Sequence, residues 1–279
     1  MGHLQLTSIR IYPVKSLAGV EVPCAEVERR GLRGDRRFMV VDAADGTFIT
    51  QREVPRMALV SSSTTDDGGI LLRATGMPDV RARIPQSAGN CAISVRVWRS
   101  TCDAVAVGAN VDQWLSQFLG RDCRLVYMSE GERRAINPQF AVRDDDHVSF
   151  ADGYPCMLIG QSSLDDLNAR LATKLPMNRF RPSLVVSGAE PFAEDGWKRV
   201  RIGEVEFDVV KPCERCKVTT IEQSTGEPSG SEPLRTLATY RRFGERILFG
   251  QNLIPEAPGT LRVGDAVEVL ETKEPATEW

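Results

Sequence analysis

Short runs of alternating apolar and polar residues follow one another through the first hundred positions of the chain. The run LTSIRIYPV alternates around Ile9 and Ile11, and VEVPCAEVE alternates less regularly. Two longer stretches carry the turn sequences Asp45-Gly46 and Gly68-Gly69 between β-prone runs, which is typical of β-hairpins. The runs DVRARI, ISVRVW and DAVAV continue the pattern. Many short strands at close spacing predict a β-barrel or β-sandwich in this half.

Three segments have the apolar spacing of helices. NVDQWLSQFLG forms one apolar stripe, with Asn110 as the expected cap and Gly120 as the expected end. SSLDDLNARLATKL begins with Ser163 and Asp166 at the spacing of a capping box. SEPLRTLATYRRF carries Pro233 in its first turn, where proline is well tolerated.

The rest of the second half is again rich in β-prone runs. KRVRIGEVEFDVV turns at Gly203, TLRVGDAVEVL turns at Gly264-Asp265, and SLVVSG is typical of a buried strand. The polar stretch 129–146 is predicted to be a solvent-exposed connection between domains. We therefore predict a mainly β protein with a few helices, of the β-barrel-rich α+β class. Its domains are expected at residues 4–125 and 126–279.

Composition narrows the function classes. The chain has 279 residues, 42% of them hydrophobic and 26% charged, as in soluble globular proteins with a substantial core. A net charge of -3 does not favour nucleic acid as a partner. No apolar run approaches the ~18 residues of a membrane span, and the N-terminus lacks a signal-peptide core. We therefore expect no membrane association, a cytoplasmic location and seven reduced cysteines.

Two of those cysteines, Cys213 and Cys216, form a C-x-x-C pair in KPCERCKVTTIE. A structural zinc site needs about four Cys or His ligands, and His3 and His147 lie in no ligand-like spacing to the pair. A redox dithiol would begin a helix, whereas the β-branched residues after Cys216 predict a strand. Burial in the core is a further alternative. The cations around the pair favour a metal-ligating thiolate; they are Lys211, Arg215 and Lys217.

Three other loops have the composition of an anion site. YPVKSLAG, GLRGDRRF and NRFRPS supply Lys15, Ser16, Arg33, Arg36, Arg37, Arg179 and Arg181. Each loop alone is more typical of a solvated charge cluster. Arginine forks and backbone donors nevertheless suit phosphate, so the three loops could converge on one phosphorylated cofactor.

Taken together, these stretches resemble the MOSC family, the molybdenum cofactor sulfurase C-terminal domain proteins. They are most similar to the subgroup with an N-terminal β-barrel, which includes amidoxime-reducing and YcbX-type proteins. NRFRPSLVVSG combined with KPCERCKVTT is the most specific signal, and the matching stretches run in family order from about residue 5 to 270. The resemblance implies an N-terminal β-barrel domain followed by a MOSC β-barrel domain.

The resemblance also implies a molybdenum cofactor, Mo-molybdopterin, and assigns roles to individual residues. Cys216 corresponds to the thiolate that ligates molybdenum, and Asp152 to the acidic residue beside the metal, so both are candidate catalytic residues. The implied cofactor-binding residues are Lys15, Ser16, Arg36, Gly153, Tyr154, Arg181, Ser183 and Asn252. Ser183 replaces the usual asparagine of the family, and Asn252 stands where the mitochondrial members have an aromatic residue.

The implied activity is that of a molybdenum-dependent oxidoreductase that reduces small N-hydroxylated substrates by oxygen-atom transfer. YcbX-type relatives often continue into a ferredoxin domain, and this chain ends without its cysteine run. We therefore expect electrons from a separate reductase, with flavin or iron–sulfur centres, and a monomer. Two alternatives remain: a sulfur or molybdenum-cofactor carrier that uses a Cys216 persulfide, and a non-catalytic pterin-binding module.

Overall fold

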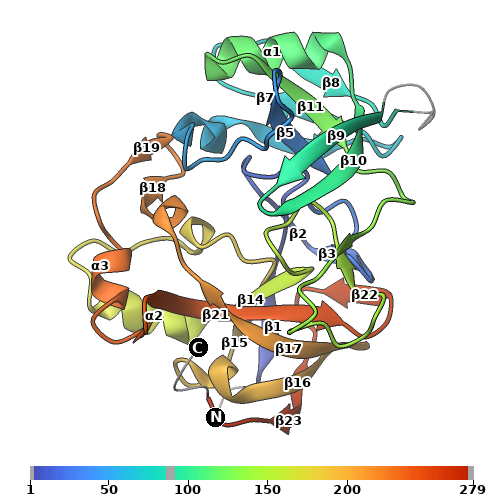
Figure 1. Cartoon of the computed structure of the whole chain (residues 1–279). Coiled ribbons are helices and arrows are strands. Elements are labelled where there is room, and N and C mark those ends of the chain that lie inside the picture. Colours follow the sequence, from blue (N-terminus) through green and yellow to red (C-terminus); the bar gives the residue numbers. More distant parts are fainter. Residues whose placement is uncertain (1–2, 86–91, 276–279) are drawn as a thin grey trace.

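The computed structural model describes residues 3–85 and 92–275, and strands dominate it (Figure 1). Three α-helices lie in the described part of the chain, so the predicted mainly β class with a few helices is confirmed. None of the helices in these residues has the length and apolar character needed to cross a membrane. Cys91, one of the seven expected thiols, falls outside the described residues, and the other six are free.

The largest sheet occupies the lower half of the molecule in Figure 1 and has nine strands. Their bounds are β1 (Gln5–Ile11), β2 (Val20–Val22), β14 (Cys156–Gly160), β15 (Leu184–Ser187), β16 (Trp197–Ile202), β17 (Val205–Glu214), β20 (Arg242–Phe243), β21 (Arg246–Pro255) and β23 (Val267–Thr272). The order is β2-β1-β15-β14-β21-β17-β16-β23, with β20 on β21. Only the β14–β15 pair is parallel. The hairpin predicted at Gly203 joins β16 to β17.

The upper half holds two smaller sheets and the longest helix. One sheet has the order β5-β11-β10-β9, and the other β6-β7-β8. Their strands are β5 (Phe38–Asp42), β6 (Ser61–Thr64), β7 (Ile70–Arg73), β8 (Val80–Ala82), β9 (Ala92–Val97), β10 (Ser100–Ala106) and β11 (Cys123–Tyr127). Helix α1 (Ala109–Leu119) buries its predicted apolar stripe in the core of this half. The hairpin predicted at Gly68-Gly69 joins β6 to β7.

The beginning of the chain is built into the C-terminal half. Strand β1 pairs with β15, and β3 (Cys24–Glu28) pairs with both β4 (Gly31–Leu32) and β22 (Gly259–Arg262). Leu6 and Ile9 belong to the same buried cluster as residues of β16, β17 and β21. The polypeptide thus passes from one half to the other at its start. The boundary placed between residues 125 and 126 stays a prediction.

The helix starts and lengths differ from the sequence patterns. Gly120 ends α1 in the left-handed conformation as predicted, but the cap position is Gly108 and not Asn110. Helix α2 (Gln161–Ala169) begins before the expected capping box, and the Ser163 hydroxyl donates instead to buried Glu194 at 2.8 Å. Helix α3 (Leu234–Leu237) is a single turn. Tertiary contacts therefore replace the expected local caps.

The polar stretch 129–146 is not the exposed connection predicted from its composition. β12 (Arg134–Ala135) pairs with β13 (His147–Val148), and Arg134, Ile136 and Asp146 are buried. The Arg134 guanidinium donates to the Ser149 carbonyl at 3.1 Å, and Asp146 accepts two backbone N–H groups at 2.9 Å. Buried charges are retained here because each has hydrogen-bond partners. The remaining short ladder is β18 (Ile221–Glu222) with β19 (Glu227–Pro228).

Candidate functional site

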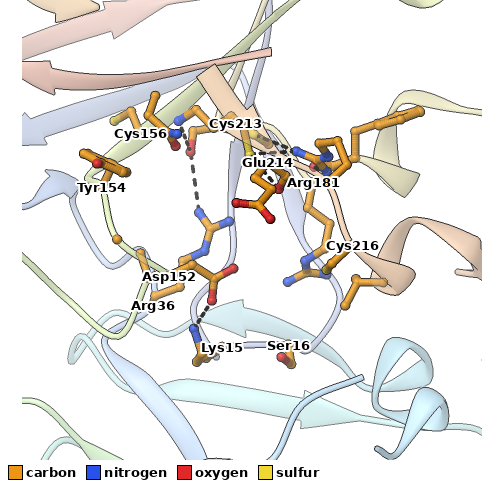
Figure 2. Close-up of a pocket in the computed structure, with 18 of the residues that line it drawn as sticks. Lys15, Ser16, Arg36, Asp152, Tyr154, Cys156, Arg181, Cys213, Glu214 and Cys216 are labelled. Carbon is orange, nitrogen blue, oxygen red and sulfur yellow. Dashed lines mark hydrogen bonds and ion pairs between the residues drawn. The ribbon is translucent and has the colours of Figure 1, made fainter. Parts of the chain in front are cut away.

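One cleft contains every catalytic and cofactor-binding residue that the family resemblance implied (Figure 2). The predicted residues in its lining are Lys15, Ser16, Arg36, Asp152, Gly153, Tyr154, Arg181, Ser183, Cys216 and Asn252. They come from segments up to 237 positions apart, between Lys15 and Asn252. The three anion loops and the C-x-x-C segment do converge, although the roles of individual residues stay predictions.

The backbone around this cleft is unusual. Ser16, Arg36 and Arg181 have φ angles of +67°, +48° and +56°, in the left-handed region that non-glycine residues rarely adopt. Trp98, which contacts Asp152, has a φ of +56°. In residues 3–85 and 92–275 only one further non-glycine residue, Phe192, has a positive φ. Strained backbone of this kind concentrates at binding sites, where the surrounding structure holds it in place.

Two lining arginines, Arg36 and Arg181, stack on the ring of Tyr12, and we call these three residues the arginine wall. The two guanidinium carbons lie 4.2 and 4.3 Å from the centre of the Tyr12 ring. Such cation–π contacts hold the face of a guanidinium group and leave its N–H groups able to donate hydrogen bonds. Gly19 leaves the space for this ring, because a Cβ there would lie 2.4 Å from a Tyr12 ring atom. The local sequence YPVKSLAG thus supplies the ring and the room for it.

The two arginines of this wall differ in their counter-charges. Arg36 donates to Asp35 at 2.5 Å, and Asp35 is only 2% exposed. Arg181 pairs with no carboxylate in the part of the chain that the structure describes. Burial, together with the neighbouring charge of Arg36, lowers the pKa of Arg181 to about 10. A negatively charged ligand in the cleft would therefore stabilise the charge of Arg181, which no carboxylate balances.

Lys15 and Asp152 form an ion pair at the floor of the cleft. The Lys15 Nζ lies 2.6 Å from Asp152 Oδ1 and also donates to the Phe150 carbonyl at 2.8 Å. Burial lowers the pKa of Lys15 to about 8, against the opposing charge of Asp152. Desolvation opposes ionisation of Asp152, yet Lys15, with help from Arg52 and the Trp98 indole, holds its pKa below the usual range. At neutral pH the pair therefore consists of a carboxylate and an ammonium group that exchanges its proton readily.

A second group of lining residues, which we call the sulfur wall, consists of Arg52, Cys213, Arg215 and Cys216. Arg52 Nη2 donates to Cys216 Sγ at 3.0 Å. Arg215 Nη1 lies 3.0 Å from Cys213 Sγ, and its Nη2 donates to the Phe180 carbonyl at 2.6 Å. Burial raises the pKa of the Cys213 thiol although Arg215 opposes the shift. Each cysteine of the motif thus has its own guanidinium.

The segment after Cys216 is not the strand predicted from its β-branched residues. It forms a 3-10 helix at Lys217–Thr220, with Cys216 extended at its start. Thr219 and Thr220 turn their hydroxyls back to the carbonyls of Cys216 and Lys217, at 2.9 and 2.8 Å. Threonine side chains that bond to nearby carbonyls offer the backbone an alternative to a sheet, which explains the difference.

The arginines singled out in the anion loops do not all reach the cleft. Arg33 is exposed and pairs with Glu26. Arg37 is buried against the Met128 carbonyl, and Arg179 is buried against the carbonyl of Thr219. Of the three cations predicted beside the cysteine pair, Arg215 lines the cleft, and Arg52, to which no sequence pattern assigned a role, lines it as well. Arg52 lies 164 positions from its sulfur partner, so no local spacing could have revealed the contact.

The lining has the chemistry of a site for a phosphorylated ligand with a soft metal. Its five cations are Lys15, Arg36, Arg52, Arg181 and Arg215, against the carboxylates of Asp152 and Glu214. Thiolate sulfur suits soft and transition metals. Among residues 3–85 and 92–275, no three His, Cys, Asp or Glu side chains converge as a metal site. A metal bound here would therefore take most of its ligands from a cofactor, which the cationic lining could hold.

Comparisons with known proteins agree with this chemistry. The model of the MOSC N-terminal beta barrel domain matches residues 3–122, and the model of the MOSC domain matches residues 145–268. "Mitochondrial amidoxime-reducing component 1" of Mus musculus is 36% identical over 274 residues, which cover 93% of this chain and 80% of that protein. The protein of the same name from Homo sapiens is 36% identical, with 93% and 81% covered. "Molybdenum cofactor sulfurase" of Oryza sativa subsp. japonica is 32% identical over this whole chain, which spans 36% of that protein.

The relatives contradict the cytoplasmic location predicted from the sequence. Both amidoxime-reducing proteins named above are mitochondrial by name. The prediction was wrong in its reasoning because it considered only secretory and membrane signals, and these do not report on import into an organelle.

Proposed function

The chain belongs to the MOSC family, and on this premise we propose that it binds the molybdenum cofactor and reduces N-hydroxylated small molecules. The observation that carries the proposal is the position of Cys216, whose sulfur lies in a cleft lined by five cations. The relatives named amidoxime-reducing components, which match nearly the whole chain, support the choice of substrate class.

The two walls divide the binding of the cofactor between them. Cys216 in the sulfur wall would supply the protein's thiolate ligand to molybdenum, since soft sulfur is a preferred donor for such a metal. Arg36 and Arg181 in the arginine wall would hold the phosphate, because their N–H donors remain available above the Tyr12 ring. Ser16, Gly153, Tyr154, Ser183 and Asn252 would complete the lining.

When bound, the cofactor would supply two-electron reduction with removal of the oxygen atom from the N–O group. The residues of this chain supply protons and orientation. Lys15 Nζ holds a proton that it can release near pH 8, and the ionised Asp152, whose Oδ1 lies 2.6 Å away, holds this ammonium group in place. This pair would deliver protons to the oxygen that leaves as water. Both residues line the cleft, so the ammonium group of Lys15 can reach a bound substrate from its pair with Asp152.

Electrons would come from a separate reductase. In the described residues no cluster of cysteines could hold an iron–sulfur centre, which needs four converging ligands. We expect no turnover of a test amidoxime with NADH or NADPH alone, and turnover with reduced viologen or with a flavin or iron–sulfur reductase. Turnover with NADH alone, free of contaminating reductase, would contradict this and indicate a flavin site.

The test of the function is metal analysis of protein purified from a host that makes the cofactor, combined with two cysteine variants. We expect about one molybdenum per chain and N-reduction, both lost in Cys216→Ser and mostly kept in Cys213→Ser. Cys213→Ser is the matched control, because it changes the same atom in the same motif. Equal loss in both folded variants would indicate a dithiol or zinc site.

Two other results would support the alternative functions, a carrier protein or a pterin-binding module. Cyanide-labile sulfur without metal would indicate a carrier with a Cys216 persulfide. Bound molybdenum without turnover by any electron donor would indicate a pterin-binding module.

A further inference from the structure

Arg52 has an unusual set of partners. It is half-buried in the lining of the cleft, and its guanidinium has no carboxylate partner within residues 3–85 and 92–275. Its one side-chain hydrogen bond there goes to Cys216 Sγ, at 3.0 Å. The Cys216 sulfur is therefore the side-chain acceptor that this half-buried guanidinium has among the described residues.

The backbone that carries Arg52 is fixed from behind the cleft. Its neighbour Gln51 is fully buried and donates to the Ser16 carbonyl at 2.7 Å. The Gln51 side chain also accepts from Gln223 at 3.0 Å. These bonds tie the loop to the Ser16 and Gln223 segments, and the Arg52 side chain donates to the sulfur.

Trp98 supports Arg52 from the side. The Arg52 guanidinium carbon lies 4.6 Å from the centre of the Trp98 ring, which also packs against Phe48 at 4.9 Å. The Trp98 indole N–H donates to Asp152 Oδ1 at 3.1 Å. One side chain therefore contacts both the partner of Cys216 and the carboxylate that pairs with Lys15.

The backbone conformation of Trp98 is energetically unfavourable, and folding by itself does not require it. It lies in the two-residue turn of the β9–β10 hairpin, which reaches toward the middle of the molecule in Figure 1. Its φ of +56° belongs to a turn position that normally takes Gly, Asn or Asp. Trp98 is 43% exposed, one of the few large hydrophobic residues at the surface of the described chain. A strained, exposed tryptophan beside a binding cleft indicates a functional constraint.

We propose that Arg52 is a positioning residue for the Cys216 sulfur, and that Trp98 holds Arg52 in place. The inference deepens the proposed function and rests on it for its catalytic meaning. A guanidinium that donates to the sulfur fixes the direction of its lone pairs and withdraws charge from it. Groups that hydrogen-bond to a metal ligand tune the metal in this way, and their loss commonly costs about 10–100-fold in affinity or activity.

The contact itself is tested without metal by a double-mutant cycle. Arg52→Gln, Cys216→Ala and the double variant are compared by thermal unfolding of the apo protein. The double variant should lose clearly less in Tm than the two single losses together, because the second substitution finds the interaction already gone. Arg56 offers a matched control, since it stacks on Phe118 at 4.6 Å outside the lining of the cleft. Arg56→Gln should be additive with Cys216→Ala. An additive Arg52 cycle would overturn the proposal.

The positioning role is tested on the molybdenum-loaded protein. Arg52→Gln should keep its molybdenum content, shift the visible absorption of the metal–thiolate bond, and lower kcat about tenfold or more at unchanged KM. Trp98→Leu should reproduce the shift, whereas Trp98→Phe, which keeps a ring beneath the guanidinium, should restore the wild-type spectrum. An unchanged spectrum and kcat in Arg52→Gln would overturn the role even if the cycle shows coupling.

The failure of the proposed function would be recognised separately. If wild-type protein carries molybdenum but reduces no N-hydroxylated compound, the spectral shift in Arg52→Gln still decides the inference. If the wild-type protein carries no molybdenum at all, the proposed function fails. The double-mutant cycle then tests by itself whether Arg52 and Cys216 interact.

Discussion

The arginine wall and the sulfur wall both contain two arginines, but the guanidinium groups have different partners in the two walls. In the arginine wall, the guanidinium groups of Arg36 and Arg181 face the Tyr12 ring, and most of their N–H donors stay free. In the sulfur wall, Arg52 and Arg215 already donate to thiol sulfur. The first wall is prepared for a hard anion such as phosphate, and the second is prepared to hold sulfur in one orientation. A cofactor with phosphate at one end and a soft metal at the other matches this division.

The backbone follows the same division. Arg36 and Arg181 are both held at positive φ, whereas neither Arg52 nor Arg215 is. Left-handed conformations cost of order 1–3 kcal/mol each and persist only where the surroundings over-determine them. In the arginine wall those surroundings include Asp35, which pairs with Arg36, and the Tyr12 ring, on which both arginines stack. In the sulfur wall the strain lies on Trp98 instead, beside Arg52.

The largest effect should separate the two arginines of the arginine wall. Arg36→Ala leaves Asp35, 2% exposed, without its cation, and breaking a buried pair in this way costs about 3 kcal/mol. Arg181→Ala breaks no ion pair among the described residues and should change the free energy of unfolding little. Denaturant unfolding of the apo proteins measures the difference. Both variants should lose molybdenum.

Arg33→Ala is the matched control for this comparison, because Arg33 lies in the same loop but pairs with Glu26 on the surface. Exposed pairs contribute about 0–1 kcal/mol, so this variant should retain stability and molybdenum. Equal unfolding free energies for Arg36→Ala and Arg181→Ala would show that Asp35 does not depend on its partner.

A smaller effect should show what the Tyr12 ring contributes. Tyr12→Phe keeps the ring and loses only the hydroxyl that donates to the Pro182 carbonyl at 3.2 Å, at a cost of about 1 kcal/mol. Tyr12→Leu removes two cation–π contacts, each worth about 0.5–2 kcal/mol. We expect molybdenum content to stay high in Tyr12→Phe and to fall severalfold in Tyr12→Leu. Equal content in the two would mean that the ring does not position the arginines.

The fold could be predicted from the sequence where its signals are local. Alternation and turn glycines located the β6–β7 and β16–β17 hairpins, because both depend on neighbouring residues. The pairing of β1 with β15 joins residues about 180 positions apart and leaves no local trace. The expected cap at Ser163 failed for the same reason, since buried Glu194 from another segment takes its hydroxyl.

The site could be predicted as far as motifs and family resemblance reach. Lys15, Asp152 and Cys216 all lie in one cleft as expected. Arg52 and Trp98 escaped notice because their importance comes from contacts with Cys216 and Asp152, 164 and 54 positions away. Asp35 escaped notice for another reason: its burial and its bond to the Tyr12 N–H exist only in the folded chain.

A pH-dependent effect concerns the ion pair of Lys15 with Asp152, which lines the same cleft. Burial lowers the pKa of Lys15 to about 8, while the unfolded chain keeps its usual value of about 10.5. Between these values the unfolded chain binds more protons than the folded protein, so the contribution of Lys15 to stability grows as the pH rises from about 8 to 10.5. Wild-type apo protein should therefore gain several degrees of Tm relative to Lys15→Met over this range. Thermal scans of both proteins at closely spaced pH values measure the gain. A difference in Tm that stays constant, or that narrows as the pH rises, would show that the ammonium group is fully stabilised by Asp152 and does not release its proton near neutral pH.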